Sequence, residues 1–313
     1  MKVIQVQAPG LFTTVQDLGR EGFGPMGVSP SGAADPMSLR LGNRLVGNAE
    51  GAAALEMTLL GGAFLFPDGA IVALAGSDFG ASLDGAPVGS WISLEARPGQ
   101  TLRLGPTRSG ARCYLCVQGG IAVKPFLGSA STHVLSGLGG LEGRPLRKGD
   151  ILNIGSASPS LRKRTIAPKA LERLSPSKVL RVTPGPQSDW FPESSQLLFY
   201  SVAYRVTEES NRMGLRLEGP PIPENSGGRM ISEGVSLGAI QIPHGGQPII
   251  LFVEQQTTGG YPKIANVISA DLHSVGQLRP RDEIRFERVD WQTARALFQE
   301  QEKLLASPEL ILK

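Results

Sequence analysis

Short runs of Val, Ile, Leu and Phe alternate with glycine and proline along most of this 313-residue chain. Runs of this length with polar and apolar positions in alternation predict β-strands, and regular turn residues between them are typical of barrels or sandwiches. The 40 glycines and 24 prolines supply those turns throughout the sequence. We therefore expect a mainly β protein with a few peripheral helices.

Three segments share one local form, a polar turn that enters a short alternating strand. They span residues 97–105, 147–155 and 279–287. The second and third each precede a stretch without strand pattern, so each is expected to close a β domain. Residues 156–178 are rich in serine, proline and basic side chains, a composition typical of linkers. The pattern predicts a first domain over 1–155, a linker over 156–178 and a second domain over 179–313 that carries a terminal helix.

Two helices are predicted from capping residues and apolar spacing. The first follows Asp35, a good N-cap before a proline, and ends near Gly47. The second follows Asp290, and its apolar stripe includes Trp291 and Phe298. We expect this second helix to pack outside the second β domain.

Composition and charge argue against membrane and nucleic-acid partners. The formal charge of +3 is spread over 31 basic and 28 acidic residues, too weak a bias for a nucleic-acid surface. No stretch supplies the ~18 consecutive apolar residues of a membrane span, and proline and glycine interrupt the amino terminus before a signal peptide can form. We expect a cytoplasmic protein.

Metal and redox chemistry also find no support. Cys113 and Cys116 have C-x-x-C spacing, but they lie in a predicted strand, where positions three apart face opposite sides. The histidines His133, His244 and His273 are far apart and lack ligand spacing. No metal site is therefore predicted.

The most informative polar residues follow the apolar run at 249–253. There Glu254 is suited to act as a base or acceptor, because side chains at a buried strand end are held rigidly. Tyr261 would shape the pocket. Residues expected to approach the substrate are Thr257, Thr258, Gly259 and Gly260. The alternative interpretation of this segment is a glycine-rich hairpin turn.

Two further polar segments are candidates for binding. Asn211 and Arg212 precede an alternating strand, and the arginine could bind a substrate carboxylate or, alternatively, a carbonyl or a nearby acid of the same chain.

The long glycine-rich and proline-rich loop near the amino terminus leads into the first helix, whose start could receive an anion. Its candidate residues are Gln16, Asp17, Arg20 and Ser31. In the alternative interpretation these side chains order the loop, since Asp35 would cap the helix itself.

Five long segments, in this order, resemble those of the family of 5-oxoprolinase C subunits, also known as allophanate hydrolase subunit 2 or the biotin-dependent carboxyltransferase family. They are GLFTTVQDLGREGFGPMGVSPSGAADP (10–36), NRLVGNAEGAAALEMTL (43–59), SNRMGLRLEGP (210–220), SEGVSLGAIQIPHGGQPI (232–249) and QTTGGYPKIANVISADL (256–272). Together they are distributed along nearly the whole chain, from residue 10 to residue 272.

The resemblance implies two cyclophilin-like β-barrel domains. It also implies a protein that works with A-type and B-type partner subunits to open 5-oxoproline to glutamate with ATP hydrolysis. The chain contains no G-x-x-x-x-G-K-[ST] loop, so we expect ATP to bind mainly through a partner. The family also includes carboxyltransferase domains of urea carboxylase, which work with biotin, and a regulatory protein that antagonises a kinase inhibitor. These two activities are the alternatives.

One family motif departs from its usual form. Family members commonly carry Asp-Arg-Gln-Thr-Thr-Gly-Gly-Tyr-Pro, where this chain begins with Glu254 and Gln255. The acid is kept with one more methylene. The arginine is lost, so an anion contact does not carry over to Gln255.

Overall fold

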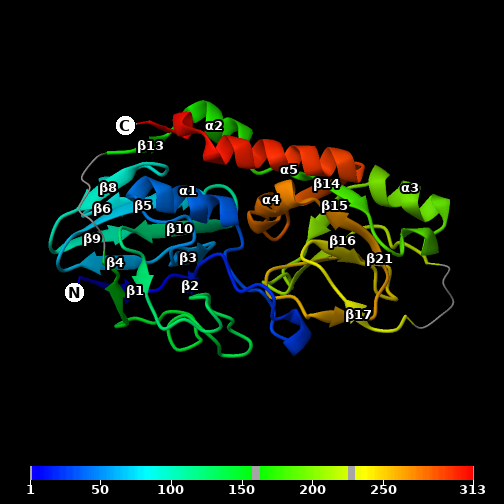
Figure 1. Ribbon diagram of the computed structural model, residues 1–313, viewed down its shortest axis with the longest axis horizontal. Coiled ribbons are helices and arrows are strands. Elements are labelled where there is room, and N and C mark those ends of the chain that lie inside the picture. The colour runs from blue at the N-terminus through cyan, green and yellow to red at the C-terminus, as the bar shows by residue number, and fades with distance from the viewer. Residues whose placement is uncertain (1, 157–162, 225–229, 313) are drawn as a thin grey trace. The chain divides into compact units, whose positions relative to one another are not determined.

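The computed structural model describes residues 2–156, 163–224 and 230–312, and the chain forms two compact units. The first unit comprises Met1–Arg20, Ser31–Leu174 and Leu305–Lys313, and the second comprises Glu21–Pro30 and Ser175–Leu304. Strands dominate both units, and helices are few (Figure 1). The predicted mainly β class is confirmed.

Most strands of the first unit form two antiparallel sheets. The seven-stranded sheet contains, in spatial order, β11 (Ile121–Ala122), β12 (Ile151–Ile154), β1 (Val3–Ala8), β4 (Ala63–Phe66), β9 (Gln100–Arg103), β6 (Ser82–Leu83) and β7 (Ala86–Pro87). The five-stranded sheet contains β2 (Phe12–Gln16), β3 (Ala54–Thr58), β10 (Arg112–Val117), β5 (Ala70–Gly76) and β8 (Ser93–Ala96). Strands β9 and β12 follow the polar turns seen in the sequence.

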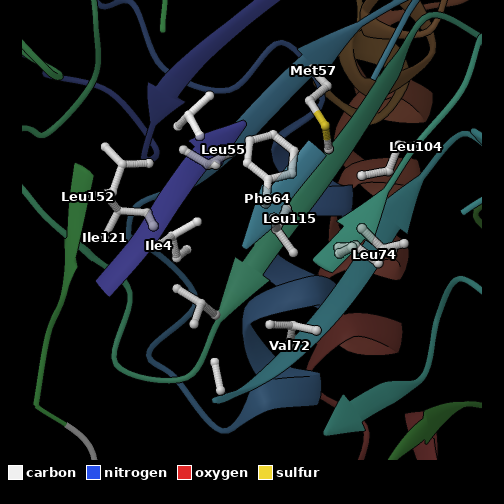
Figure 2. Close-up of a cluster of buried hydrophobic side chains, with 14 of the residues drawn as sticks. Ile4, Leu55, Met57, Phe64, Val72, Leu74, Leu104, Leu115, Ile121 and Leu152 are labelled. Carbon is white, nitrogen blue, oxygen red and sulfur yellow. The ribbon is translucent and has the colours of Figure 1, made fainter. Parts of the chain in front are cut away.

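Apolar side chains from both sheets form the core of this unit (Figure 2). Phe64 of β4 and Leu115 of β10 are fully buried within it. Alternation along the strands places these residues on inward faces, which explains why the apolar runs are short and regularly spaced.

Helix α1 (Pro36–Val46) packs against β5 and β10. The side chain of Asp35 accepts a hydrogen bond from Ser38 N, and Gly47 ends the helix with a φ of 79°. The predicted caps of the first helix are confirmed.

The expected linker contains secondary structure that its composition did not reveal. Within 156–178 lie β13 (Thr165–Ile166), which pairs with β23 (Ile311–Leu312), and α2 (Pro168–Arg173). The pairing partner is distant in sequence, so the residues around 165 carry no pattern that predicts this strand. Residues 157–162 lie outside the described residues. The domain boundaries at 155 and 179 stay a prediction.

The second unit is built on a closed barrel. In order, its strands are β14 (Val179–Pro184), β21 (Lys263–Val267), β18 (Ala239–Gln241), β19 (Ile249–Leu251), β16 (Gly214–Glu218), β15 (Tyr204–Val206) and β22 (Glu283–Arg288). Neighbours are antiparallel except β14 and β22, which pair in parallel and close the barrel. A separate two-stranded antiparallel sheet pairs β17 (Glu233–Gly234) with β20 (Thr258–Gly259).

The α-helices described in the second unit are α3 (Glu193–Ser201), α4 (Leu272–Gly276) and α5 (Trp291–Ala306). Helix α3 packs against the barrel strand β22. Phe199 of α3 stacks on Phe286 of β22 with ring centroids 4.6 Å apart. Helix α5 begins as predicted after Asp290, but Trp291 and Phe298 are 63% and 41% exposed. These two residues of its apolar stripe therefore lie largely in solvent.

The short 3-10 turns are η1 (Gly24–Met26), η2 (Ser188–Trp190), η3 (Ser269–Asp271) and η4 (Pro308–Leu310).

Candidate functional site

The backbone pairing of β16 and β19 continues past both strand ends and brings Arg212 beside Glu254. Phe252 N donates to Met213 O at 2.9 Å, and Glu254 N donates to Arg212 O at 2.8 Å. A polar pair is thereby fixed at one end of a barrel whose neighbouring positions are apolar.

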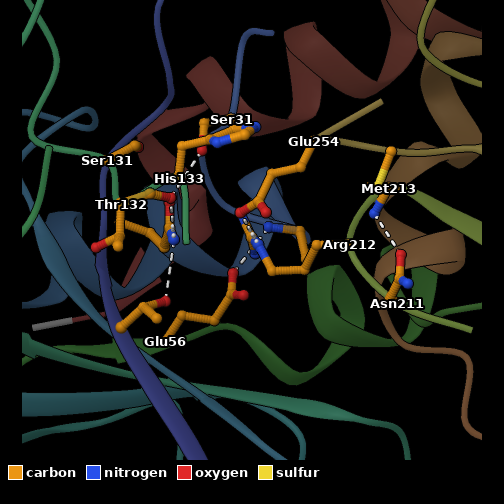
Figure 3. Close-up of polar contacts among 12 residues, drawn as sticks. Ser31, Glu56, Ser131, Thr132, His133, Asn211, Arg212, Met213 and Glu254 are labelled. Atoms are coloured by element: carbon orange, nitrogen blue, oxygen red, sulfur yellow. Dashed lines mark hydrogen bonds and ion pairs between the residues drawn. The ribbon is translucent and has the colours of Figure 1, made fainter. Parts of the chain in front are cut away.

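Arg212 and Glu254 form a buried ion pair (Figure 3). Arg212 Nε donates to Glu254 Oε1 at 2.5 Å, and the two side chains are 7% and 3% exposed. Removing one member of such a pair leaves an uncompensated buried charge, at a cost of about 3–5 kcal/mol. The pair holds the Glu254 carboxylate in one orientation.

Asn211 and Tyr261 occupy more exposed positions. The side-chain oxygen of Asn211 accepts a hydrogen bond from Met213 N at 2.8 Å, which closes the turn before β16. Tyr261 is 40% exposed, and its ring meets His244 edge-on with centroids 6.0 Å apart. The described contacts of Asn211 order its own turn.

The threonine and glycine segment forms a strand rather than a simple turn. Thr258 and Gly259 make up β20, and Thr257 O accepts a hydrogen bond from Val235 N at 3.2 Å. A Cβ added to Gly259 would lie 2.5 Å from Gln241 Nε2. A larger residue at this position would therefore displace the end of the Gln241 side chain, which packs against the Gly259 backbone.

A group of polar side chains, here called the glutamine-lysine cluster, surrounds the place where the Gln241 amide lies against Gly259. Its members are Gln187, Glu233, Gln241, Gln255, Gln256 and Lys263. Gln241 of β18 and Lys263 of β21 are direct cross-strand neighbours and are 1% and 4% exposed. Polar groups buried in a barrel must be paired, since an unpaired one is costly.

Lys263 is paired with Glu233 of β17. Lys263 Nζ lies 2.5 Å from Glu233 Oε1, which also accepts a hydrogen bond from Gln187 Nε2 at 3.0 Å. The hydrogen bond from Lys263, followed by that from Gln187, holds the pKa of the Glu233 carboxyl below its ordinary value. The carboxylate form is thus favoured at neutral pH.

In the side-chain amides of Gln241 and Gln255, only one of the two polar atoms has a hydrogen-bond partner among the described residues. Gln241 Oε1 accepts from Gln256 Nε2 at 3.3 Å, and Gln255 Nε2 donates to Val235 O at 3.2 Å. Within the described part of the chain, Gln241 Nε2 and Gln255 Oε1 are buried and have no hydrogen-bond partner. Leaving such a group unsatisfied costs about 1–3 kcal/mol.

Sequence reasoning missed Gln241 and Lys263. Gln241 is the last residue of β18 and Lys263 is the first residue of β21. Each is the lone polar residue of a short apolar run, A-I-Q-I or P-K-I-A, and this was the available signal. Gln255 stood out in the sequence only as a departure from the family motif.

Asp17 organises a distant loop of the first unit. It accepts hydrogen bonds from Ser129 Oγ at 2.6 Å, from Ala130 N at 2.6 Å and from Ser131 Oγ at 2.5 Å. These bonds hold residues 129–131 against the end of β2.

The other candidates of the amino-terminal loop act in the same way. Gln16 Nε2 donates to Thr132 O at 3.1 Å. Ser31 Oγ donates to the same oxygen at 2.8 Å (Figure 3). Arg20 lies over the Phe126 ring, 5.6 Å from its centroid. The contacts favour the alternative interpretation, in which these residues order the loop.

A second buried acid, Glu56 of β3, also escaped the sequence reasoning. Its Oε2 accepts from Tyr114 Oη at 2.7 Å and from Ala34 N at 2.8 Å, and Arg112 Nε lies 3.8 Å from its Oε1. Burial and then the charge of Glu56 raise the pKa of the Tyr114 phenol well above its ordinary value. Glu56 was detectable only as a lone acid in the apolar strand 53–59.

The cysteines lie in β10 as predicted, and both are buried free thiols. Cys113 belongs to the core, whereas Cys116 faces α1, where a Cβ on Gly42 would lie 2.6 Å from its sulfur. Among the residues described, His, Cys, Asp and Glu form no group of three that could hold a metal ion. In the same residues, no helix is long and apolar enough to cross a membrane.

Comparison with known proteins gives one family and two kinds of relative. The family model for the carboxyltransferase domain, subdomain A and B, matches residues 26–288. The chain is 38% identical to the C subunit of 5-oxoprolinase from Escherichia coli over 301 residues, 96% of each chain.

Two further matches are to parts of much longer proteins. Urea amidolyase of Saccharomyces cerevisiae is 36% identical over 97% of this chain but only 18% of its own length. The crystal structure of K. lactis urea amidolyase superposes with a TM-score of 0.90 at 34% identity, covering 99% of this chain and 21% of that one.

Proposed function

Because the chain belongs to the family of the carboxyltransferase domain, subdomain A and B, we propose that it is a subunit of an ATP-dependent 5-oxoprolinase. With A-type and B-type partners, it opens 5-oxo-L-proline to L-glutamate as ATP is hydrolysed. The supporting observation is the 38% identity to the C subunit of 5-oxoprolinase over 96% of both chains.

The chemistry explains the need for partners. A lactam is stabilised by resonance, so water opens it at neutral pH only after activation. Phosphoryl transfer from ATP to the lactam carbonyl oxygen supplies that activation. One water then attacks the carbonyl carbon and the ring nitrogen leaves as the amine, which gives an acyl phosphate, and a second water hydrolyses the acyl phosphate to glutamate and phosphate. The chain has no recognisable nucleotide motif, so ATP is assigned mainly to a partner, while this protein supplies substrate contacts and a base.

Glu254 is the proposed base or orienting group for the attacking water. Its ion pair with Arg212 holds the carboxylate in place, so the arginine serves to position Glu254. Asn211 closes the turn that carries Arg212, and the exposed Tyr261 borders the path by which the substrate reaches Glu254.

A carboxyltransferase component of a biotin-dependent, urea carboxylase-like system is the second candidate. The likeness to K. lactis urea amidolyase over 99% of this chain favours it. This reaction needs a biotinylated partner, because the chain lacks an AMKM-like attachment motif. In a third candidate, a regulatory binding protein, the same surfaces would bind a partner without chemistry.

One pair of assays separates the candidates. The chain is combined with the products of its neighbouring genes, and glutamate release from 5-oxoproline is measured beside biotin-dependent carboxylation of urea. Glutamate release supports the proposal. Carboxylation alone would establish the second candidate, and inactivity in both assays despite a stable complex would favour the third.

A further inference from the structure

Helix α5 exposes two aromatic side chains on one face. Trp291 and Phe298 are 63% and 41% exposed, and they are the most exposed tryptophan and the most exposed phenylalanine of the described chain. Residues seven positions apart lie on the same side of an α-helix, two turns from each other. A single exposed apolar residue is ordinary on a protein surface, but two aromatic rings aligned on one helix face are typical of an interaction surface.

An open cavity of about 620 Å³ lies beside Trp291. Its lining comes from the end of β14 and from the segment that joins β22 to α5, namely Thr183, Pro184, Arg288, Val289, Asp290 and Trp291. Asp290 already caps the helix, because its Oδ1 accepts a hydrogen bond from Thr293 N at 2.7 Å. The groups left to meet a binding partner are therefore chiefly the Trp291 ring, the apolar wall and the Arg288 guanidinium.

Two arginines lie on either side of Trp291 along the chain. Arg288 shares the cavity with the tryptophan, and Arg295 follows it by one helical turn. Among the residues that the structure describes, neither guanidinium forms an ion pair. The helix positions three and four residues from Arg295 carry Trp, Gln, Phe and Gln, so no carboxylate on the same face of α5 competes for it. Both positive charges are thus available to carboxylates of another molecule.

We propose that Arg288, Trp291, Arg295 and Phe298, here called the Trp291 surface, dock a partner subunit through a segment that presents an apolar side chain beside carboxylates. The apolar side chain would enter the cavity against the Trp291 ring, and the carboxylates would pair with the two arginines. Tryptophan and arginine are among the residues that most often dominate the binding energy of protein interfaces. The existence of a partner subunit rests on the proposed function, whereas the surface rests on the exposed rings, the cavity and the arginines.

Association of the full chain with each of its two cognate subunits, and with both together, tests the surface by calorimetric titration. Trp291→Ala should raise Kd at least about 30-fold, because truncation of a central interface tryptophan removes one of its main anchors. Arg288→Glu and Arg295→Glu should each raise Kd at least about 10-fold. Added salt should weaken the wild-type complex more than either arginine variant, because salt screens exposed ion pairs.

Two control variants make similar changes away from the Trp291 surface. Leu11→Ala removes an apolar side chain of the first unit that is also 63% exposed. Lys303→Glu reverses an exposed charge on a different face of α5. Both should leave Kd within about 2-fold of wild type. All four residues of the Trp291 surface are exposed, so the thermal melting of their variants should match that of the controls.

Turnover separates docking from chemistry. The Trp291 surface binds a partner and not the substrate, so kcat at saturating subunit concentrations should equal that of wild type, while the concentration needed for half-maximal rate should rise. If the variants weaken association but the complete wild-type mixture releases no glutamate, the surface stands and the proposed function falls. If Kd is unchanged by Trp291→Ala and by both arginine variants, the surface is wrong, and glutamate release still decides the function.

Sedimentation of the isolated chain tests a different occupant. If wild type self-associates, and Trp291→Ala abolishes that association without changing Kd for either cognate subunit, the surface binds a second copy and the proposal is overturned. Failure of the wild-type chain to bind either subunit also overturns it. A monomeric wild-type chain whose partner affinity depends on Trp291 supports the proposal.

Discussion

Arg212 Nε lies 2.5 Å from Glu254 Oε1, and both side chains are almost completely buried beyond the ends of β16 and β19. The pair lies one residue from Gln255 of the glutamine-lysine cluster. Glu254 can therefore act in two ways, as a reacting group in the proposed lactam opening and as a structural counter-charge for Arg212. These roles make different predictions.

Replacing Glu254 by Gln keeps its size and one hydrogen-bond acceptor but removes the base. If the carboxylate takes a proton in the slow step, kcat of the assembled complex should fall by roughly 10²-fold or more. Steady-state kinetics with 5-oxoproline measure this change, and analytical gel filtration checks that the subunits still associate.

Asp271→Asn provides a matched control for the loss of a buried charge. Asp271 is 2% exposed and pairs with Arg181 at 2.5 Å in the same unit. Both variants should lose thermal stability, but only Glu254→Gln should lose kcat at a temperature where both are folded. A folded, assembled Glu254→Gln variant with near-normal kcat would remove Glu254 from the catalytic residues.

The ion pair of Glu233 and Lys263 predicts a dependence of stability on pH. Because the pKa of Glu233 is held below its ordinary 4.5 in the folded state, its contribution is present above that value and is lost as the pH falls through the folded pKa. At neutral pH, Glu233→Gln should lower the free energy of unfolding by about 1.5 kcal/mol, a low value for a charged hydrogen bond because Glu233 is 45% exposed.

Urea denaturation of both proteins at several pH values tests this assignment. The difference between wild type and Glu233→Gln should be largest above pH 4.5 and should shrink in more acidic solution. A difference that grows on acidification would contradict the pairing.

Cys113 and Cys116 should be inert thiols in the folded protein. Burial, the largest cause for both, raises the pKa of each thiol far above its ordinary value, and the thiolate is the reactive form. Iodoacetamide at neutral pH should modify neither cysteine, whereas both should react in denaturant. Mass spectrometry that finds rapid alkylation of the native chain would contradict their placement.

Limited proteolysis should cut first within 156–178. The serine, proline and basic composition of this stretch is typical of chain segments that proteases can reach. Strand β13 and helix α2 occupy part of the stretch, so the first cuts are expected in its irregular part. The fragments are mapped by mass spectrometry. First cuts inside 71–155 would contradict the two-domain division.

Local signals in the sequence identified what depends on local structure. The caps Asp35 and Gly47, the start of α5 and the polar turns before β9, β12 and β22 are all visible in a few consecutive residues. The mainly β class followed from the same short-range alternation.

The missed features depend on contacts between distant residues. Thr165 pairs with a strand near residue 312, so its strand has no local signature. The importance of Gln241 depends on Gly259 and Lys263 being its neighbours, which only strand register provides. The role of Arg212 remained open in the sequence because its partner lies 42 residues away.

Glutamate release from 5-oxo-L-proline tests the central proposal most directly. The chain, its two cognate subunits and every partial mixture are assayed with and without ATP. The account predicts release by the complete mixture, only with ATP, and none by this chain alone, because it has no recognisable nucleotide motif. Glutamate release by the isolated chain with ATP would show that the nucleotide site is misassigned, and no release by the complete, assembled mixture with ATP would contradict the proposed function.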